Sequence, residues 1–312
     1  MLFSFSLIKL GSSKGVYAVH PLIHAWGRDR MSSEDRQEYC LMAYIILACS
    51  LPQTFNEQLY QFRKILVTHL RANIKHSVMV KEMVDRYFDD AHEKFGKLLR
   101  EQGYDREAEG FQLQVLDARS KTLGEEHPDT IGAMGDLAST YWSLGKYADA
   151  EKMQVKVLDL RNVLLGEEHP DTISAMDDLA ITYKSLRKYE DIEKLQIKVL
   201  NMRNILLGEE HHDTVLAMGN LANTYWSLGK YADAEKLQNK VLDMRNRLLG
   251  VEDPHTILAM GNLANTYGSL GKYADAEQLQ IKVLHLGNRL LGEEHPDTIT
   301  AMNNLAAIYE SM

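Results

Sequence analysis

"LGEEHPDT" occupies residues 123–130, and the same eight letters return at 165–172 and 291–298. Two altered copies, "LGEEHHDT" at 207–214 and "LGVEDPHT" at 249–256, complete a series with a strict 42-residue period. A fixed period of this length is typical of proteins that stack one supersecondary unit, so it outweighs the usual expectation of about two domains for such a chain. The period therefore predicts one elongated array.

Each unit carries two segments in which apolar residues recur at helical spacing. The first segment repeats its apolar positions at steps of 3, 3, 1 and 3, and the second alternates steps of 3 and 4. In one copy these positions are Val215, Met218, Leu221, Ala222 and Tyr225, followed by Ala234, Leu237, Val241, Met244 and Leu248. The pattern predicts a pair of amphipathic helices whose listed residues are buried.

The quoted string stands where one unit ends and the next begins. Its Gly follows the last apolar residue of a helix, where a left-handed residue closes the helix end. Pro then begins the next helix, with Asp and Thr beside it to satisfy the exposed amides. The shorter link "SLGKYADAE" places Gly145, Gly229 and Gly271 at the turn within each pair, whereas one copy has Arg187 there. Both strings indicate structural punctuation and not an active site.

These letters resemble the tetratricopeptide repeat, whose signature positions correspond to Leu221, Ala222, Tyr225 and Ala234. The longer string "GEEHPDT…NLANTY…GKYADAE" resembles the 42-residue repeats of kinesin light chains. The resemblance implies an all-α, right-handed α-solenoid of antiparallel helix pairs over residues 83–312, with about five and a half repeats. Residues 33–82 are expected to form a degenerate helical pair.

Residues 1–32 are of a different kind. Two strand-like runs, "FSFSLIKL" and "GVYAVH", precede the helical string "PLIHAWGRDRM". This stretch resembles the end of the winged-helix segment of fungal receptor-like proteins with NB-ARC or NACHT ATPase domains. The resemblance implies a small β-hairpin and helix remnant, with the ATPase itself outside this chain.

Composition narrows the class of protein. The 35 basic and 44 acidic residues give a net charge of −9, which disfavours a nucleic-acid partner. Cys40 and Cys49 lie in an apolar stretch and are expected to be reduced core thiols of a cytoplasmic protein. The apolar opening "MLFSFSLIKL" is read as a buried strand, because it is far shorter than the ~20 residues of a membrane span.

The sequence contains no strong motif for catalysis or metal binding. The periodic histidines cannot share a zinc ion, because stacked helices lie ~8–10 Å apart and zinc ligands stand at ~2 Å. His20 and His24 have ligand spacing but no third ligand nearby. No phosphate loop, nucleophile elbow or zinc-protease motif is found. We therefore expect no enzyme, no metal site and no cofactor.

The surface of the first helices remains as the candidate site. Residues opposite their buried face form one stripe per repeat, and the resemblance places these stripes along a concave groove. Asparagine suits capture of an extended peptide backbone, because its amide both donates and accepts hydrogen bonds. A solvated face kept by recent duplication is the alternative. The predicted groove residues are Asp136, Ser139, Asp178, Leu216, Asn220, Asn223, Leu258, Asn262, Asn265 and Asn304.

The sequence also suggests roles for two tryptophans and a charge for the partner segment. Trp142 and Trp226 either anchor a partner at the groove edge or pack between repeats. The groove stripes carry Asp136 and Asp178 and no basic residue, which favours a neutral or basic partner segment.

The sequence thus predicts a non-catalytic scaffold that binds a protein or peptide, such as the sensor or assembly arm of an NLR-like switch protein. A cargo adaptor of the kinesin light chain type is the alternative, although the heptads of a coiled coil are missing.

The last string, "AMNNLAAIYESM", completes a first helix with no second helix after it. Its apolar positions are Ile299, Met302, Leu305 and Tyr309. Repeat arrays need a polar cap at such an end, so self-association or fraying is expected there.

Overall fold

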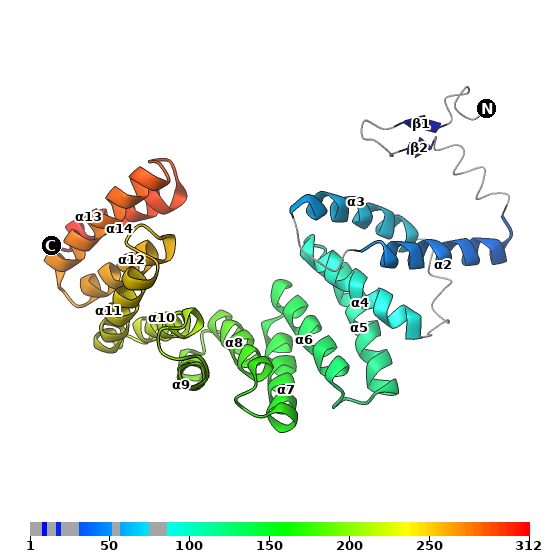
Figure 1. The fold of residues 1–312 in the computed structure, drawn as a ribbon, viewed down its shortest axis with the longest axis horizontal. Coiled ribbons are helices and arrows are strands. Elements are labelled where there is room, and N and C mark those ends of the chain that lie inside the picture. Colours follow the sequence, from blue (N-terminus) through cyan, green and yellow to red (C-terminus); the bar gives the residue numbers. More distant parts are fainter. Residues whose placement is uncertain (1–7, 11–16, 20–30, 52–56, 75–85) are drawn as a thin grey trace. The chain divides into compact units, whose positions relative to one another are not determined.

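A computed structural model describes residues 8–10, 17–19, 31–51, 57–74 and 86–312 of the chain. The chain divides into two compact units, residues 1–144 and 145–312 (Figure 1). The predicted all-α solenoid of antiparallel helix pairs is confirmed, because within each unit successive helices pack against one another.

The first unit begins with a short hairpin. Strands β1 (Ile8–Leu10) and β2 (Tyr17–Val19) pair antiparallel, with Lys9 opposite Ala18. The helix expected after Pro21 lies outside the described residues. The helices that follow are α2 (Ser33–Cys49), α3 (Glu57–Ile74), α4 (Arg86–Glu101), α5 (Asp105–Thr122) and α6 (Pro128–Ser143).

The core of the first unit forms where α2, α3 and α4 meet and continues along α5. Leu70, Phe95 and Leu99 are at most 1% exposed there. The expectation of a core thiol is wrong for Cys49, which lies in the last turn of α2 and is exposed as a free cysteine. The side chain of Cys40 lies outside the described residues.

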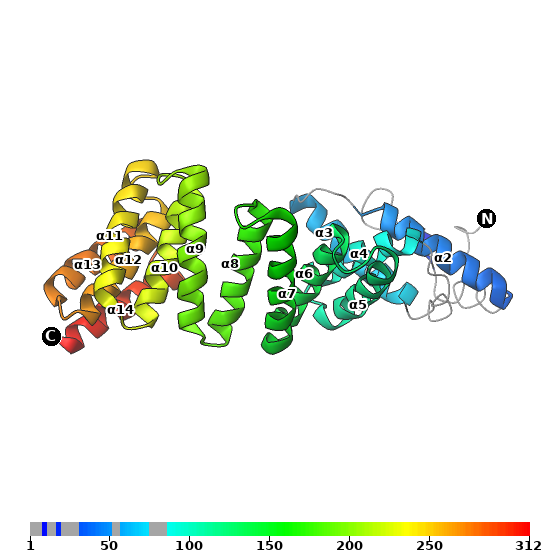
Figure 2. The same cartoon turned by 90° about the horizontal axis from the view of Figure 1, so that it is seen from below.

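The second unit contains four first helices that alternate with four second helices (Figure 2). Each helix packs on the next along the chain, and the first helices α10 and α12 also contact each other. The helices are α7 (Tyr147–Leu165), α8 (Pro170–Ser185), α9 (Tyr189–Leu207), α10 (His212–Ser227), α11 (Tyr231–Leu248), α12 (Pro254–Ser269), α13 (Tyr273–Leu290) and α14 (Pro296–Ser311).

Most residues of the predicted apolar faces of α10 and α11 are buried, and Tyr225 and Leu237 are half-buried. Val215, Met218 and Leu221 of α10 are each 3% exposed, and Ala222 is fully buried. The prediction is wrong for Leu248, which is 50% exposed. It stands in the last turn of α11, where the amphipathic pattern continues beyond the end of the packed face.

The link between successive 42-residue repeats has part of the predicted structure. Gly166 has φ 88° and ψ 163°, a conformation that only glycine adopts readily, so it is not the left-handed helical cap we expected. Pro170 is the first residue of α8, as predicted. The cap itself is His169, whose Nδ1 accepts a hydrogen bond from the Asp171 amide at 3.2 Å. Thr172 does not cap, because it is fully buried under the helix.

The turn within each pair also depends on a positive φ. Gly229 has φ 72°, and in the irregular copy Arg187 adopts φ 58°. Arg187 is the only non-glycine residue with a positive φ in the described part of the chain. The irregular copy therefore keeps the turn despite the strain of its side chain.

The final helix α14 leaves most of its predicted apolar face in solvent. Ile299, Met302 and Tyr309 are 45%, 37% and 50% exposed. Their counterparts Val215 and Met218 are covered by the second helix of their own pair. The uncovered face is therefore the surface on which a second helix packs in the other repeats.

Candidate functional site

The candidate site lies on the second unit, where packing fixes the rotation of α10 and α12. Burial of Val215, Met218 and Leu221 turns the opposite side of α10 outward. Leu216 on that side is 39% exposed, and Leu258, its counterpart on α12, is 58% exposed. The outward stripe predicted from the sequence is therefore on the surface of both helices.

A shallow pocket brings five of the predicted groove residues together. It lies between α10 and α12 and reaches down to α11. Its volume is about 80 Å³, well below the ~300–1,000 Å³ of drug-sized ligand sites, so it fits a side chain of a larger partner. The lining residues are Leu216, Gly219, Asn220, Asn223, Gln238, Val241, Arg245, Leu258, Ala259 and Asn262.

The polar part of the pocket lining consists of neutral amides and one cation, and apolar side chains such as Leu216, Val241 and Leu258 form the rest. Asn220 and Asn223 come from α10 and Asn262 from α12, and each amide carries both a donor and an acceptor. Gln238 is 5% exposed, and its Oε1 has no hydrogen-bond partner among the described residues. Arg245 approaches from α11 and donates from Nη1 to the His255 carbonyl at 2.7 Å.

Three other predicted residues of this unit do not line the pocket. Asp178 is exposed on α8, Asn265 is exposed on α12, and Asn304 is half-buried on α14. They lie on first helices of the same unit, in the stripe positions that the repeat assigns them.

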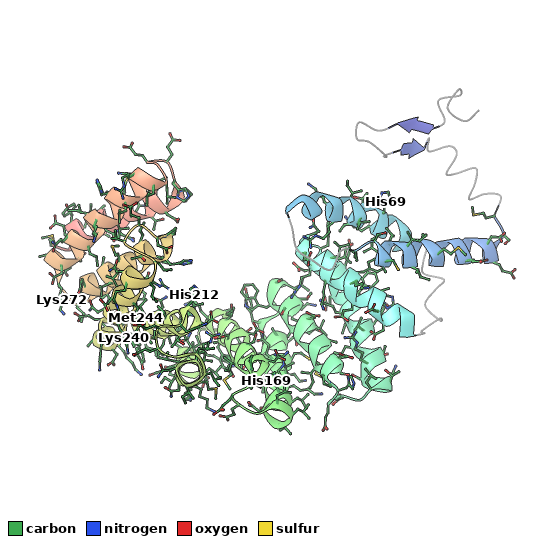
Figure 3. The ribbon with its side chains drawn as sticks, viewed as in Figure 1. His69, His169, His212, Lys240, Met244 and Lys272 are labelled. Atoms are coloured by element: carbon green, nitrogen blue, oxygen red, sulfur yellow. The ribbon has the colours of Figure 1, made fainter. Side chains whose placement is uncertain are left out.

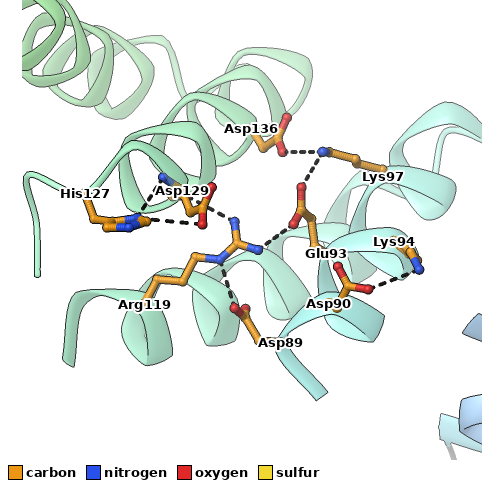
Figure 4. Close-up of polar contacts among 9 residues, drawn as sticks. All are labelled: Asp89, Asp90, Glu93, Lys94, Lys97, Arg119, His127, Asp129 and Asp136. Carbon is orange, nitrogen blue, oxygen red and sulfur yellow. Dashed lines mark hydrogen bonds and ion pairs between the residues drawn. The ribbon is translucent and has the colours of Figure 1, made fainter. Parts of the chain in front are cut away.

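The two remaining groove residues, Asp136 and Ser139, belong to the first unit on α6. The Ser139 hydroxyl donates to the Gly135 carbonyl of its own helix at 3.0 Å. Asp136 lies 3.5 Å from Nζ of Lys97, which also contacts Glu93 (Figure 4). The charge of Asp136 is therefore compensated by a lysine that the sequence stripe did not reveal.

The two tryptophans are partly exposed. Trp142 is 38% exposed and Trp226 is 42% exposed. The indole N–H of Trp226 donates to the Ser269 hydroxyl at 3.1 Å, which links the ends of α10 and α12. Trp226 therefore contacts the neighbouring repeat while part of its ring stays on the surface.

Arg245 was missed by the sequence reasoning, which considered only the first helices. Its signal lies in a constant offset along the chain. Arg119 and Arg203 occupy the same position in their repeats, and the residue 26 positions earlier is an acid in both cases. For Arg161 and Arg245, which occupy the same position in their repeats, that residue is a glycine, Gly135 and Gly219.

The histidines gather no metal site in the part of the chain that the structure describes. His169, labelled in Figure 3, caps α8, and His212 lies at the start of α10. The rings of His212 and His255 stand edge to face with centroids 6.3 Å apart.

Comparison with protein families now adds to the geometry. Models of the tetratricopeptide repeat match residues 89–162, 133–204, 184–247 and 256–297, which together exceed half of the chain. The chain belongs to the tetratricopeptide repeat family. A search of curated proteins finds no significant match. Within the described residues, no TPR helix combines the length and apolar character needed to cross a membrane.

Solved structures share the TPR fold. A putative kinesin light chain of nearly identical TPR-like repeats from Podosopora anserina is 23% identical, with a TM-score of 0.59 over 64% of this chain and 95% of that one. BtubC (BKLC) from P. vanneervenii is 21% identical, with a TM-score of 0.57 over 85% of this chain and 95% of that one.

A third structure is a Signal Transduction ATPase with Numerous Domains from Pyrococcus horikoshii, which has a TPR sensor. It is 15% identical, with a TM-score of 0.59. The match covers 98% of this chain but 54% of that protein.

Proposed function

We propose that this TPR array is a non-catalytic interaction module that holds an extended segment of a partner protein between α10 and α12. The observation that carries the proposal is the pocket that collects Asn220, Asn223 and Asn262. Helix interiors gain little from asparagine, whereas exposed amides facing a hollow can pair with a peptide backbone.

The exposed leucines support the same surface. Leu216 and Leu258 flank the amides from two neighbouring helices. An apolar side chain of the partner that covers both would remove their exposed area from water, which contributes about 25 cal/mol per Å². Backbone capture by the amides and apolar contact by the leucines together describe a sequence-tolerant site.

The charge of the partner segment is a further part of the proposal. Asp178 is exposed on α8 but already interacts within the chain. The proposal of a neutral or basic partner segment therefore rests on the groove stripes as a whole, which carry acids and no basic residue. In the first unit, Lys97 offsets the charge of Asp136.

The larger context is also proposed. The match to an ATPase with a TPR sensor favours the sensor or assembly arm of a switch protein. In that arrangement residues 1–32 are a winged-helix remnant, residues 33–82 a degenerate helical pair and residues 83–312 the TPR array. A cytoplasmic location accords with the free thiol of Cys49.

A cargo adaptor is the second candidate. The similarity to a putative kinesin light chain and to BtubC favours it, since both share the repeat architecture. In-frame sequence upstream of Met1 separates the two roles, because a phosphate-binding loop supports the switch protein and heptads support the adaptor.

Selection from a random peptide library tests the site itself. Peptides enriched on the wild-type chain are expected to lose affinity for a variant with Asn220, Asn223, Asn262 and Asn265 all changed to Ala. The matched control is Asn239→Ala on α11, which removes an exposed amide that does not line the pocket. Equal affinity for the wild type and the quadruple variant would reject the site.

A further inference from the structure

An arginine stands at the same position in the second helices α5, α7, α9 and α11, as Arg119, Arg161, Arg203 and Arg245. Two of the four, Arg119 and Arg203, pair with an acid, whereas the residue 26 positions before Arg161 is Gly135 and Arg161 donates to the Asp171 carbonyl at 2.7 Å. Nη2 of Arg203 lies 2.5 Å from the Asp177 carboxylate on the preceding first helix. Arg119 pairs in the same way with Glu93 at 2.5 Å and also binds Asp89 at 2.9 Å (Figure 4). In both repeats the arginine therefore has a carboxylate within its own array.

Arg245 lacks that partner. The residue at the corresponding place on α10 is Gly219, and a Cβ built there would lie 3.8 Å from Nη2 of Arg245. The space that Asp177 fills for Arg203 is therefore open beside Arg245. That space belongs to the pocket between α10 and α12, since both Gly219 and Arg245 line it.

The acids nearest to Arg245 are committed elsewhere. The Asp253 carboxylate caps α12 by accepting from the His255 amide at 2.8 Å. Glu210 shares a second hollow with Arg245 but pairs with Arg247 at 3.0 Å. Among the described residues, no carboxylate forms an ion pair with Arg245, and its one hydrogen bond goes to a backbone carbonyl.

Arg245 is partly buried, and no carboxylate among the described residues pairs with its charge. Desolvation lowers the pKa of Arg245, and the more distant charge of Asp253 offsets only part of that effect. A guanidinium withdrawn from water without a counter-ion is unfavourable, and a carboxylate that reaches it gains a charge-assisted hydrogen bond. The remaining polar groups of the pocket are neutral amides, so none of them repels an anion.

We propose that Arg245 binds the side-chain carboxylate of an Asp or Glu in the partner segment, at the place that Asp177 occupies beside Arg203. This inference rests on the proposed function and names the residue that the pocket selects. An internal side chain is favoured over a chain terminus, because side-chain carboxylates fill the site in the two repeats that have one. An apolar residue next to the acid would contact Leu216 and Leu258.

The partner segment that follows from this has mixed charge. Its acidic residue lies over α11 between α10 and α12, and the rest of the segment is neutral or basic. The sequence-based expectation of a neutral or basic partner is thus narrowed to one part of the segment.

The decisive variant is Gly219→Asp, which supplies the missing carboxylate from within the chain. It should recreate the contact of Asp177 with Arg203 and occupy the site. The matched control is Gly261→Asp on α12, where the residue 26 positions later is Gly287 and not an arginine. A Cβ at Gly219 meets only Nη2 of Arg245, at 3.8 Å, and one at Gly261 meets nothing within 4 Å, so both variants should fold, which circular dichroism checks.

The probes are synthetic versions of the peptides enriched from the random library on the wild-type chain. We expect an Asp or Glu at a fixed place beside an apolar residue in the enriched sequences. Changing that acid to its amide should weaken binding about tenfold, as loss of a hydrogen bond between charged groups implies. Gly219→Asp should weaken binding similarly, while Gly261→Asp should leave it unchanged. Amidation of the peptide C-terminus should also leave it unchanged.

The outcomes separate this inference from the function on which it rests. Peptides that depend on the asparagines but show no acid preference, and that bind Gly219→Asp as well as wild type, would overturn the carboxylate site alone. A loss of affinity on C-terminal amidation would assign Arg245 to chain termini and overturn the side-chain proposal. Failure of the library to yield any enriched peptide would overturn both. A gain of acid-dependent binding in Asp177→Gly would support it independently, because that change frees Arg203.

Discussion

Nζ of Lys230, in the turn before α11, lies 2.7 Å from both carboxylate oxygens of Glu193, which belongs to the second helix of the preceding pair. Lys188 with Glu151 and Lys272 with Glu235 repeat this contact at the same separation of 37 residues. Each of these lysines also stands over a tyrosine ring, at 5.7 Å for Lys230 and Tyr225. The contact joins neighbouring repeats at a fixed register.

Reversing one charge of this contact should weaken the array. We expect Lys230→Glu and Glu193→Lys each to lower the midpoint of thermal unfolding, and the double variant to regain part of the loss. The effect is small, because the lysine is exposed and salt screens it. A double-mutant cycle by calorimetry at low salt measures it, and additive losses would show that the contact contributes nothing.

The same contact has a pH dependence of known sign. Hydrogen bonding to Glu193 raises the pKa of Lys230 above its ordinary value. The contribution of this contact to the free energy of unfolding is therefore complete at neutral pH. It is lost as the pH rises from the ordinary pKa of lysine to beyond the raised pKa of Lys230.

Replacing Arg187 by glycine should stabilise the second unit. A left-handed conformation costs a non-glycine residue about 1–2 kcal/mol, and the added freedom of glycine in the unfolded chain offsets about 0.5–1 kcal/mol of that. We expect a net gain of about 0.5–1 kcal/mol in the free energy of unfolding, measured by urea denaturation. Gly229→Arg is the control and should lose a similar amount, whereas an unchanged midpoint for Arg187→Gly would contradict the assigned strain.

His92 should make the first unit sensitive to mild acid. Burial lowers its pKa from 6.5 to about 4, although the charge of Asp89 acts in the opposite direction. A base whose pKa falls on folding binds its proton first in the unfolded chain, so its stabilising contribution is complete above pH 6.5 and is lost between about pH 6.5 and 4.

A comparison of two proteins isolates this effect from the titration of carboxylates. The free energy of unfolding of the wild type should fall more between pH 7 and pH 5 than that of His92→Gln, because glutamine does not titrate. Equal slopes for the two proteins would show that His92 is protonated as readily in the folded chain as in the unfolded one.

The open face of α14 should promote self-association. Changing both Ile299 and Met302 to Gln removes the exposed apolar pair and should lower the weight-average mass at high concentration in sedimentation velocity. Val163→Gln is the control, because Val163 is 84% exposed on α7 and lies outside this face. A wild type that stays monomeric at high concentration would refute the expectation.

The sequence predicted the helices well and the polar contacts poorly. Period and amphipathic spacing located α6 to α14, because burial of one face of each helix decides where a helix lies. The outward position of Asn220 and Leu216 followed from the same geometry. The compensation of Asp136 by Lys97 did not follow, because Lys97 belongs to a weaker repeat in which the register is less evident.

The helix caps and the role of Arg245 could not be predicted from the sequence. Asp and Thr are common cap residues, yet His169 caps α8 and Thr172 is buried. His211 forms the same cap on α10, where His212 stands in place of the proline. Arg245 was visible as a repeated letter in the second helix. Its importance depended on Gly219 in a different helix, and only the packed structure brings those two positions together.

The register contacts described above are all set by offsets within one 42-residue unit. Unequal recombination between copies of the gene segment can remove or insert a whole 42-residue repeat. Each turn lysine then still has a glutamate 37 residues before it, and each helix still has its capping residue. Loss of a number of codons that is not a multiple of 42 breaks the contacts that span the deletion. The array can thus change its length in steps of a whole 42-residue repeat without losing these contacts.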